Sequence, residues 1–275
     1  MMITSRLEDF IEEDLGYNDI SCTLVPDNPQ KAVIFAKEKC VLAGTDIAKE
    51  ILDYFGIQYE QHFNDGDFLG AGDIIYDLDG DAVSILRAER LTLNFLGHLS
   101  GIATLTRKCV DIIPKHSRTK IAATRKTTPG LRKYEKLAVI AGGGDPHRFN
   151  LSDSIIIKDN HRNIMGLKSA ILEAQKRTSF TQKIEVEVES VDDALIAAKM
   201  NVDIIMLDNM SPEEIIDTIS ALQAEGLRER VIIEISGGIS QDNLKDFVDI
   251  DADIISMGSL IHKSHWIDIS LEIKK

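Results

Sequence analysis

The sequence has few cysteines and few aromatic residues. Cysteine occurs three times in 275 residues, at Cys22, Cys40 and Cys109, with no CxxC pair and no spacing typical of a metal site. This excludes a disulfide scaffold and fits a protein of a reducing compartment. Aromatic residues make up 5% of the chain. So few rings argue against stacking platforms for single-stranded nucleic acid.

Long apolar runs are also lacking. No stretch approaches the roughly 20 apolar residues that a membrane-spanning helix needs. The first 16 residues are acidic and carry no long apolar segment, so we expect no signal peptide and a cytoplasmic protein. Basic residues are outnumbered, because 31 Lys and Arg face 45 Asp and Glu for a net charge of −14. This balance argues against general binding of nucleic acid.

One segment departs from the acidic background. Between residues 118 and 136 only Glu135 opposes a group of seven cations, namely Arg118, Lys120, Arg125, Lys126, Arg132, Lys133 and Lys136. A positive segment in an acidic protein suggests a site for an anionic small molecule. The alternative is a solvated basic face without function.

The chain after Pro114 alternates apolar runs with helical segments, which is the pattern of βαβ units. The predicted strands are Lys120–Lys126, Ser154–Asn160, Lys183–Glu189, Val202–Asn209, Val231–Gly238 and Ala252–Ser259. The predicted helices are 165–177, 190–200, 212–225 and 241–248, with Ser190 and Ser211 as N-caps and Pro212 in a first turn. Six strands fall short of an eight-stranded barrel, so an open doubly wound sheet remains an alternative.

The first part of the chain has a different pattern. We expect a helix over 5–15, strand structure within 32–43, a helix capped by Thr45 that ends at Gly56, and short strands at 57–63 and 73–78. Asp81 is expected to cap a long helical region that Gly97, Gly101 and Pro114 would break. The final residues alternate apolar and polar and predict a strand. The predicted domains are 1–113, a barrel domain 114–265, and a strand 266–275 that returns to the first domain.

Polar groups follow every predicted strand after Pro114. Because the carboxyl ends of parallel strands meet at one edge, these groups predict an active site. The ends are Arg125–Lys126, Lys158–Asn160, Glu187–Glu189, Asp208–Asn209, Ser236–Gly237–Gly238 and Gly258–Ser259.

The strand-end residues divide by charge. Arginine and lysine match carboxylates and phosphates, so the predicted anion-binding residues are Arg125, Lys126, His147, Arg148 and Lys158. Acidic residues suit Mg²⁺, which is usually held by one or two carboxylates plus substrate oxygens, so Glu187 and Asp208 are the predicted metal ligands. Glu185 and Glu189 share the alternation of Glu187, and periodicity cannot choose among the three. An internal salt bridge is the alternative for each acid.

Small residues follow the last two strands. Ser236–Gly238 and Gly258–Ser259 predict loops whose N–H groups approach a phosphate. Gly142–Gly144 lacks a following GK[ST] and is interpreted as a turn that brings His147 and Arg148 inward. His262, just after the last strand end, is a further substrate-binding candidate.

Several motifs resemble the quinolinate phosphoribosyltransferase family. They are ATRKTTPGLRKYEKLAV, GGGDPHRFNLSD and IIIKDNH, with EEDLGYNDI and AERLTLNFLGHLSGIAT before them and EVEVES, IIMLDN, ISGGI and SMGSLIH after them. The resemblance implies an α/β fold, an incomplete TIM-like barrel with an N-terminal α/β sandwich domain. It implies that quinolinate and phosphoribosyl pyrophosphate give nicotinate mononucleotide, CO₂ and pyrophosphate with Mg²⁺ and no organic cofactor.

The resemblance also assigns roles. Arg125, Lys126, His147, Arg148 and Lys158 fall on substrate-binding positions of the family. Glu187 and Asp208 fall on acids near the ribose and metal, and the glycine-containing strand ends on phosphate loops. Lys126, Glu187 and Asp208 are expected to be catalytic. Arg90 matches an arginine donated across a dimer interface, which implies at least a homodimer.

Two positions depart from the family pattern, Ala123 where Asp is frequent and His98 where Gln or Arg is common. Four alternatives remain. They are a related family associated with molybdate transport, a nicotinate phosphoribosyltransferase that does not decarboxylate, a Schiff-base lyase using Lys126 or Lys158, and a non-catalytic sensor of phosphate ligands.

Overall fold

The computed structural model describes residues 4–274, which form two compact units. The first unit contains the residues up to Leu105, Ile140–Gly143 and the residues from Ser264 onward. The second contains Thr106–Val139 and Gly144–Lys263. Helix α3 (Ala82–Ile112) begins in the first unit and ends in the second.

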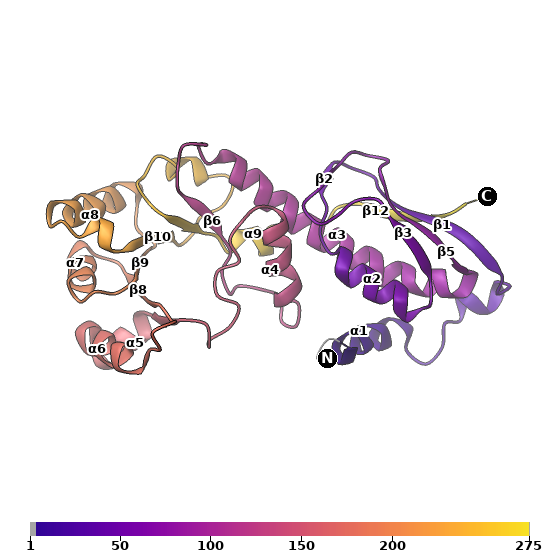
Figure 1. The fold of residues 1–275 in the computed structure, drawn as a ribbon, viewed down its shortest axis with the longest axis horizontal. Coiled ribbons are helices and arrows are strands. Elements are labelled where there is room, and N and C mark those ends of the chain that lie inside the picture. The colour runs from indigo at the N-terminus through magenta and orange to yellow at the C-terminus, as the bar shows by residue number, and fades with distance from the viewer. Residues whose placement is uncertain (1–3, 275) are drawn as a thin grey trace. The chain divides into compact units, whose positions relative to one another are not determined.

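The first unit is built on an antiparallel sheet with the strand order β12-β1-β5-β3. The strands are β1 (Pro29–Ala36), β3 (Gln58–Gln61), β5 (Ile74–Asp81) and β12 (Ile269–Ile273). The C-terminal β12 pairs with β1, with Ile34 opposite Leu271. Beside this sheet lies α2 (Thr45–Tyr54) (Figure 1), whose buried Ile47 and Ile51 fill the core. The remaining elements are α1 (Thr4–Leu15), the 3₁₀ turn Ser21–Leu24 and the short pair β2 (Cys40–Val41) and β4 (Phe68–Leu69).

The start of α2 differs from the prediction. Thr45 is the first residue of the helix, and Gly44 is the N-cap without a side-chain hydrogen bond. The carboxylate of Asp65 accepts the N–H groups of Gly44 at 3.1 Å and Thr45 at 2.9 Å. A residue 20 positions away therefore supplies the acceptor that a local cap would have given.

Helix α3 is also longer than predicted, because Gly97 and Gly101 do not break it. These glycines make room for the segment before β12. A Cβ at Gly101 would lie 2.0 Å from the backbone oxygen of His265, and one at Gly97 would lie 2.8 Å from that of Ile267. The segment is fixed there by a hydrogen bond of 3.0 Å from the Ile267 N–H to the Gly97 oxygen. Within the helix, glycine thus permits close backbone approach.

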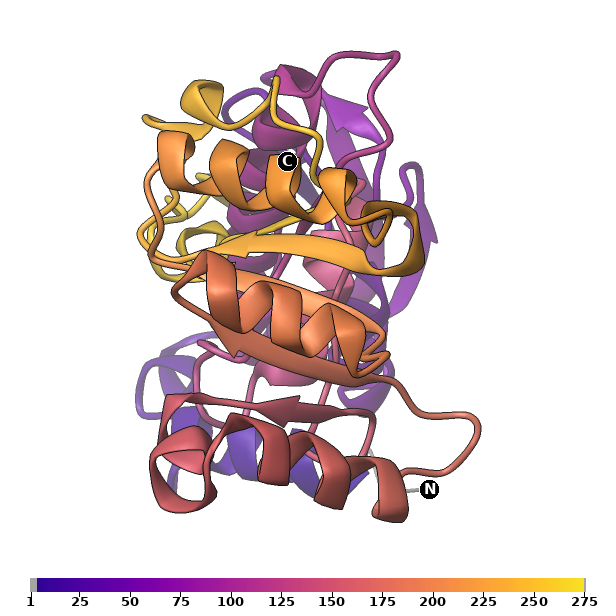
Figure 2. The ribbon, with the colours of Figure 1, turned by 90° about the vertical axis from the view of Figure 1, so that its left-hand side faces the viewer.

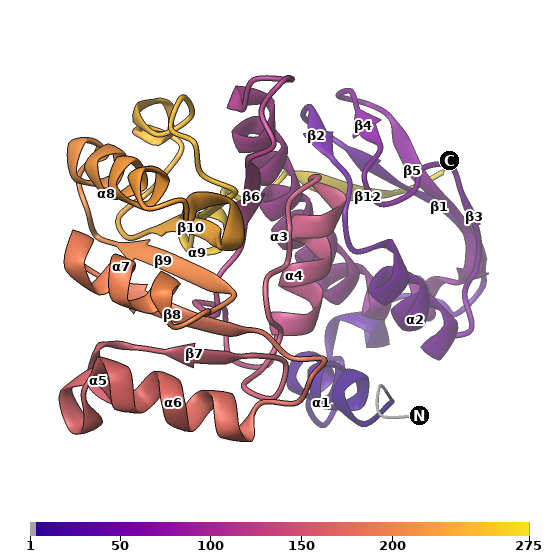
Figure 3. The same cartoon turned by 60° about the vertical axis from the view of Figure 1, so that its left-hand side comes forward.

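The second unit holds a parallel six-stranded sheet, and all six predicted strands belong to it. They are β6 (Lys120–Ala122), β7 (Ile155–Ile157), β8 (Ile184–Val188), β9 (Ile204–Asp208), β10 (Ile232–Ser236) and β11 (Ile254–Ser256). The outer helices are α5 (Asp159–Met165), α6 (Leu167–Arg177), α7 (Val191–Lys199) and α8 (Pro212–Ala224). Figure 2 and Figure 3 show α6, α7 and α8 side by side on the outer face of the strands. The other helices are α4 (Arg132–Ala141) and α9 (Ser259–His262).

The strand order β6-β11-β10-β9-β8-β7 decides between a barrel and a doubly wound sheet. From β7 to β11 successive strands are neighbours, and β6, the first strand of this sheet, pairs with β11, the last, so the sheet curls as a barrel does. No ladder among the described residues joins β6 to β7. The predicted fold class is confirmed as an incomplete α/β barrel together with a separate antiparallel sheet domain.

Of the four helices predicted after Pro114, three are confirmed and one is wrong. Ser190 caps α7 and Ser211 caps α8, where Glu214 completes a capping box and Pro212 occupies the first turn. The predicted helix over 241–248 is wrong, because only a 3₁₀ turn, Leu244–Asp246, forms there. A second 3₁₀ turn, Arg228–Arg230, precedes β10. Of the helices within 4–274, none combines the length and the apolar character that crossing a membrane requires.

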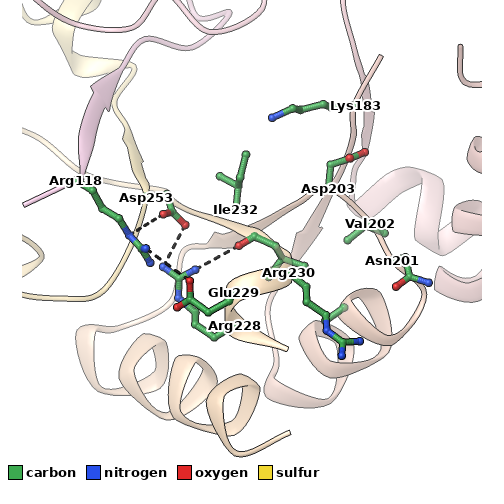
Figure 4. Close-up of a pocket in the computed structure, with 12 residues that line it drawn as sticks. Arg118, Lys183, Asn201, Val202, Asp203, Arg228, Glu229, Arg230, Ile232 and Asp253 are labelled. Carbon is green, nitrogen blue, oxygen red and sulfur yellow. Dashed lines mark hydrogen bonds and ion pairs between the residues drawn. The ribbon is translucent and has the colours of Figure 1, made fainter. Parts of the chain in front are cut away.

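Ion pairs join the amino-terminal ends of the strands around a cavity of 410 Å³ (Figure 4). Arg228, only 3% exposed, contacts Asp251 at 3.2 Å and Asp253 at 3.1 Å. Asp253 also contacts Arg118 at 3.0 Å and accepts the Ile233 N–H at 2.8 Å. Arg118, Arg228 and Asp253 are linked to one another by these contacts, so the arrangement supports the sheet.

The close approach at α3 predicts that Gly101→Ala lowers the free energy of unfolding by about 1–3 kcal/mol, as overpacking does. The added Cβ must displace the His265 carbonyl, which outweighs the better helix propensity of alanine. Gly70→Ala is the matched control, since its Cβ would meet nothing closer than 3.6 Å. Urea denaturation of both variants measures the effect. Equal midpoints would show that the 265–267 segment is not held against the helix.

Candidate active site

A polar cavity of 480 Å³ lies at the carboxyl ends of the parallel strands. All of its lining residues belong to the second unit. They are Thr124, Arg125, Lys126, His147, Arg148, Ile156, Lys158, Asp159, Arg162, Glu187, Glu189, Met206, Asp208, Asn209, Glu234, Ser236 and Ser256.

Strand alternation explains which residues line it. On β8, β9 and β10 the residues at the cavity are two apart, for example Met206 and Asp208, or Glu234 and Ser236. The register sets Glu187 beside Met206 and Asp208 beside Ser236. Side chains of one parity face the barrel interior. The predicted strand-end groups therefore converge because the strands are parallel and in register.

Lys158 and Glu187 form an ion pair across the cavity, between the end of β7 and β8. The Lys158 side chain is 43% exposed and that of Glu187 12%. Arg162, on α5, donates to the backbone oxygen of Glu187 at 3.0 Å and pairs with Asp193. Arg162 was not among the predicted site residues, although it lies four residues after Lys158 and directly follows the motif IIIKDNH. The alternative of an internal salt bridge thus describes Glu187 in this structure.

Two of the arginines that line the cavity are Arg125 and Arg148. Arg125 is half-buried, and its buried Nε has no hydrogen-bond partner. Arg148 donates to the backbone oxygen of Ser154 at 2.9 Å. Burial, and next the charge of Arg125, lowers the pKa of Arg148. A guanidinium with unused donors in a cavity is ready to bind a carboxylate or phosphate. Lys126 is exposed at the cavity margin.

The loop from Gly144 to His147 runs beside β6. Asp145 and Ala122 form a parallel β-bridge, with the Asp145 N–H donating to Ile121 at 2.8 Å. His147 adopts a φ of 54°, an uncommon conformation for a residue other than glycine. The carboxylate of Asp145 accepts the His147 N–H at 2.7 Å, and buried Lys136 donates to the Pro146 oxygen. Burial lowers the pKa of Lys136 to about 8.

His147 meets two acids at the inner end of the cavity. Its Nε2 lies 3.3 Å from Oε2 of Glu234 and 3.7 Å from Oε2 of Glu185. Burial alone would lower the pKa of His147, but the hydrogen bond and charge of Glu234, with the charge of Glu185, raise it. The Arg148 N–H, 2.7 Å from Nδ1, opposes this rise, since a doubly protonated ring would lose that contact. Burial, and next the charge of Glu234, raises the pKa of Glu185 to about 8.

Glu187 and Asp208 could hold a hard cation. Both offer carboxylate oxygens from neighbouring strands, which is the donor type that Mg²⁺ prefers. Asp208 Oδ2 accepts from the Asn209 amide at 2.7 Å, and no contact in the described chain engages Oδ1. Glu187 would have to release Lys158. The residues therefore fit the ion that the sequence predicted.

Other predicted residues do not line the cavity. Gly237, with a φ of 98°, packs so closely on Asn209 that a Cβ would lie 2.6 Å from its backbone nitrogen. A Cβ on Gly258 would lie 3.0 Å from the Lys126 side chain and 3.5 Å from His262. Ser259 is buried and donates its hydroxyl to the Ile239 oxygen at 2.9 Å. Gly238 and His262 are exposed. Arg90 is exposed on α3 in the first unit.

Sequence reasoning missed some polar residues of the cavity. They are Thr124, Arg162, Glu234 and Ser256. Asp159 and Asn209 stood within predicted strand ends but were given no role of their own. Alternation from Ser236 would have found Glu234, which precedes it by two positions on β10. A glutamate amid isoleucines in a buried strand was the available signal.

Comparison with known proteins agrees with this geometry. Two family models match nearly the whole chain, Quinolinate phosphoribosyl transferase, N-terminal domain over residues 19–100 and C-terminal domain over residues 102–272. A protein of Methanothermobacter thermautotrophicus named Probable nicotinate-nucleotide pyrophosphorylase (carboxylating) is 44% identical over 98% of both chains. Human nicotinate-nucleotide pyrophosphorylase (carboxylating) is 33% identical over 98% of this chain and 91% of its own.

Solved structures give the same result. NadC from Streptococcus pyogenes is 39% identical and superposes with a TM-score of 0.91 over 100% of this chain and 98% of that one. Nicotinate-nucleotide pyrophosphorylase from Francisella tularensis is 36% identical, with a TM-score of 0.92 over 99% and 96%. The polar cavity at the strand ends, the two-unit architecture and these matches along the whole chain show that this protein belongs to the quinolinate phosphoribosyltransferase family.

Proposed function

We propose that the chain transfers a phosphoribosyl group from phosphoribosyl pyrophosphate to quinolinate, with decarboxylation to nicotinate mononucleotide, CO₂ and pyrophosphate, in NAD biosynthesis. The observation that carries the proposal is the division of charge in the cavity. Cations come from the ends of β6 and β7, from the 144–148 loop and from α5, and the acids other than Asp159 lie on β8, β9 and β10 or directly follow β8. One side suits an aromatic diacid and the other suits a ribose and a metal ion. The relatives' printed names agree with this reaction.

The cationic side is suited to carboxylates. Arg125 has an unused buried donor, and Arg148 and Lys158 stand on the same side. Their combined charge would compensate the two carboxylates of quinolinate, which would be expensive to bury unpaired. A monocarboxylate would leave part of this charge without a partner. We also propose the small-residue segments Ser236–Gly238 and Gly258–Ser259 as phosphate-binding loops.

The acidic side is suited to the transfer step. Departure of pyrophosphate leaves positive charge on the ribose carbon, and the carboxylates of Glu187 and Asp208 would stabilise it. Lys126, at the cavity margin, would stabilise the departing anion. The pyridine nitrogen attacks the ribose carbon and becomes positively charged. The positive nitrogen then stabilises the electron pair that stays on the adjacent ring carbon when its carboxylate leaves as CO₂. That carbon takes up a proton from water, so no organic cofactor is needed in this proposal.

The assay that tests the function uses purified protein, Mg²⁺, phosphoribosyl pyrophosphate, and carboxyl-labelled quinolinate or nicotinate in parallel. We expect labelled CO₂ and mononucleotide from quinolinate and no mononucleotide from nicotinate. Product from nicotinate would instead assign a transferase that does not decarboxylate. Extensively dialysed protein supplied only with Mg²⁺ should keep full activity. Borohydride with substrate should trap nothing, since a trapped adduct would indicate an imine on Lys126 or Lys158.

We propose that Mg²⁺ is held by Glu187 and Asp208 with oxygens of the substrate. When bound, the ion would neutralise charge on the leaving pyrophosphate. We predict that Asp208→Asn lowers kcat by about 10²–10³ and raises the Mg²⁺ concentration for half-maximal activity. Asp217→Asn, on the exposed face of α8, is the control. An unchanged Mg²⁺ dependence in Asp208→Asn would remove this residue from the metal site.

We propose a homodimer in which Arg90 completes the active site of the partner subunit. Arg90 is exposed, and no hydrogen bond or ion pair engages it in the chain over residues 4–274. The first unit also exposes Tyr17, Ile20 and Leu24, apolar side chains of the kind that protein interfaces cover. A cytoplasmic location is proposed as well, supported by three buried cysteines without disulfides.

Sharing of Arg90 predicts complementation. Arg90→Ala and Lys126→Ala should each be nearly inactive alone, because each removes a cation from every site. Mixed and refolded one to one, they should regain about a quarter of the wild-type activity, since half of the dimers are mixed and each has one intact site. No recovery in a mixture that contains heterodimers by native mass spectrometry would place Arg90 in its own subunit's site.

A further inference from the structure

Three ionisable side chains meet at the inner end of the cavity, in a cluster of His147, Glu185 and Glu234. The glutamates are 1% and 2% exposed, and His147 bridges them through Nε2. Oε1 of Glu185 and Oε1 of Glu234 are buried without a hydrogen-bond partner. The cluster thus contains two acids that the transfer step described above does not use.

Fold stability does not account for these acids. Burying a carboxylate is unfavourable unless it is fully paired, and an unsatisfied buried oxygen adds to the penalty. Apolar residues fill equivalent interior positions elsewhere, such as Met206, which lies beside Glu234 on β9. Buried polar groups that weaken a core are expected where function requires them.

The hydrogen bonds of the His147 ring define what the cluster can do. The N–H of Arg148 donates to Nδ1 at 2.7 Å, so Nδ1 acts as an acceptor. The proton of the neutral ring therefore lies on Nε2, which faces Glu234. A cation bound by the three side chains would need the lone pair of Nε2, and the displaced proton would have to enter the contact with Arg148. The ring arrangement therefore favours a hydrogen-bonded anchor over a metal site.

We propose that Glu234 is a positioning residue for recognition of the acid substrate, acting through His147. Its carboxylate accepts a hydrogen bond from the Nε2–H group of His147 and fixes the orientation of the imidazole. The imidazole in turn holds the Arg148 backbone by accepting its N–H, so Glu234, His147 and Arg148 form one connected chain. The guanidinium at the end of this chain lines the cavity and is directed by its contact with the Ser154 oxygen. This inference rests on the proposed function and deepens it by naming a determinant of quinolinate binding.

The strained backbone of His147 explains why such an anchor is needed. A φ of 54° is unfavourable for a residue with a Cβ, and such conformations persist only where several contacts hold them. The Asp145 carboxylate accepts the His147 N–H, and Lys136 donates to the Pro146 oxygen of the same peptide unit. Glu234 supplies the contact that holds the side chain. Glu185, at 3.7 Å, is the more distant of the two acids and has the lesser part.

The experiment compares Glu234→Leu and Glu234→Gln with the wild-type protein. Leucine removes the acceptor, and we expect the KM for quinolinate to rise about tenfold while the KM for phosphoribosyl pyrophosphate changes less than twofold. Glutamine keeps an oxygen that can accept a hydrogen bond from Nε2–H, and it should restore the KM for quinolinate to within about threefold of wild type. Glu229→Gln, an exposed glutamate at the opposite ends of the strands, is the control and should change neither KM.

A second measurement separates positioning from general loss of structure. Nitrogen-15 NMR of the imidazoles should show His147 with its proton on Nε2 in the wild-type protein and in Glu234→Gln, and a mixture of tautomers in Glu234→Leu. Equal increases in both KM values, an unchanged quinolinate KM in Glu234→Leu, or failure of Glu234→Gln to restore it would overturn the proposal. If the wild-type protein does not use quinolinate, the proposed function fails, and the tautomer comparison still decides whether Glu234 positions His147.

Discussion

The backbone pairing between Asp145 and β6 is the constraint on which the rest of the site depends. In the six-stranded sheet the outer edge of β6 has no strand partner within residues 4–274. Asp145 binds this edge, because its N–H donates to the Ile121 oxygen at 2.8 Å and its oxygen accepts the Ala123 N–H at 2.9 Å. Because residue 145 is fixed there, residues 146–148 must turn toward the barrel interior. The left-handed conformation of His147 is the result of this turn. The missing strands of the barrel therefore make room for the residues that give the cavity its inner end.

Side chains of opposite charge line the cavity, and two of them neutralise each other in an ion pair. Lys158 belongs to the cationic side and Glu187 to the acidic side, yet they are paired. An anion bound to Lys158 would release Glu187, and a cation bound to Glu187 would release Lys158. Such an exchange would couple occupancy of the two sides with a positive sign. Arg162 donates to the Glu187 backbone oxygen, a contact that does not depend on the partner of the Glu187 side chain.

The sequence predicted which strand ends meet better than it predicted the local structure around them. The strand ends were predictable because alternation and parallel order leave few arrangements open, and they correctly brought Lys158, Glu187 and Asp208 to one cavity. Glu234 was missed because it lies within a strand and not at its end. A single acid among isoleucines does not change the apolar pattern that predicts a buried strand. The prediction that Gly97 and Gly101 break the helix was wrong. Glycine is needed there because a chain segment more than 160 positions away packs against the helix. The acceptor for the start of α2, Asp65, is also non-local, at 21 positions from Gly44.

The two ends of the parallel sheet divide stability and chemistry between them. At the amino-terminal ends Arg228 is paired with Asp251 and Asp253, and Figure 4 shows its contact with Asp253. At the carboxyl ends buried atoms of Arg125, Glu185 and Glu234 remain without partners. Unpaired buried groups destabilise the folded state by about 1–3 kcal/mol each, so they persist only where the remaining fold can offset them. The closed network at one end allows the polar groups at the other to remain available for substrate.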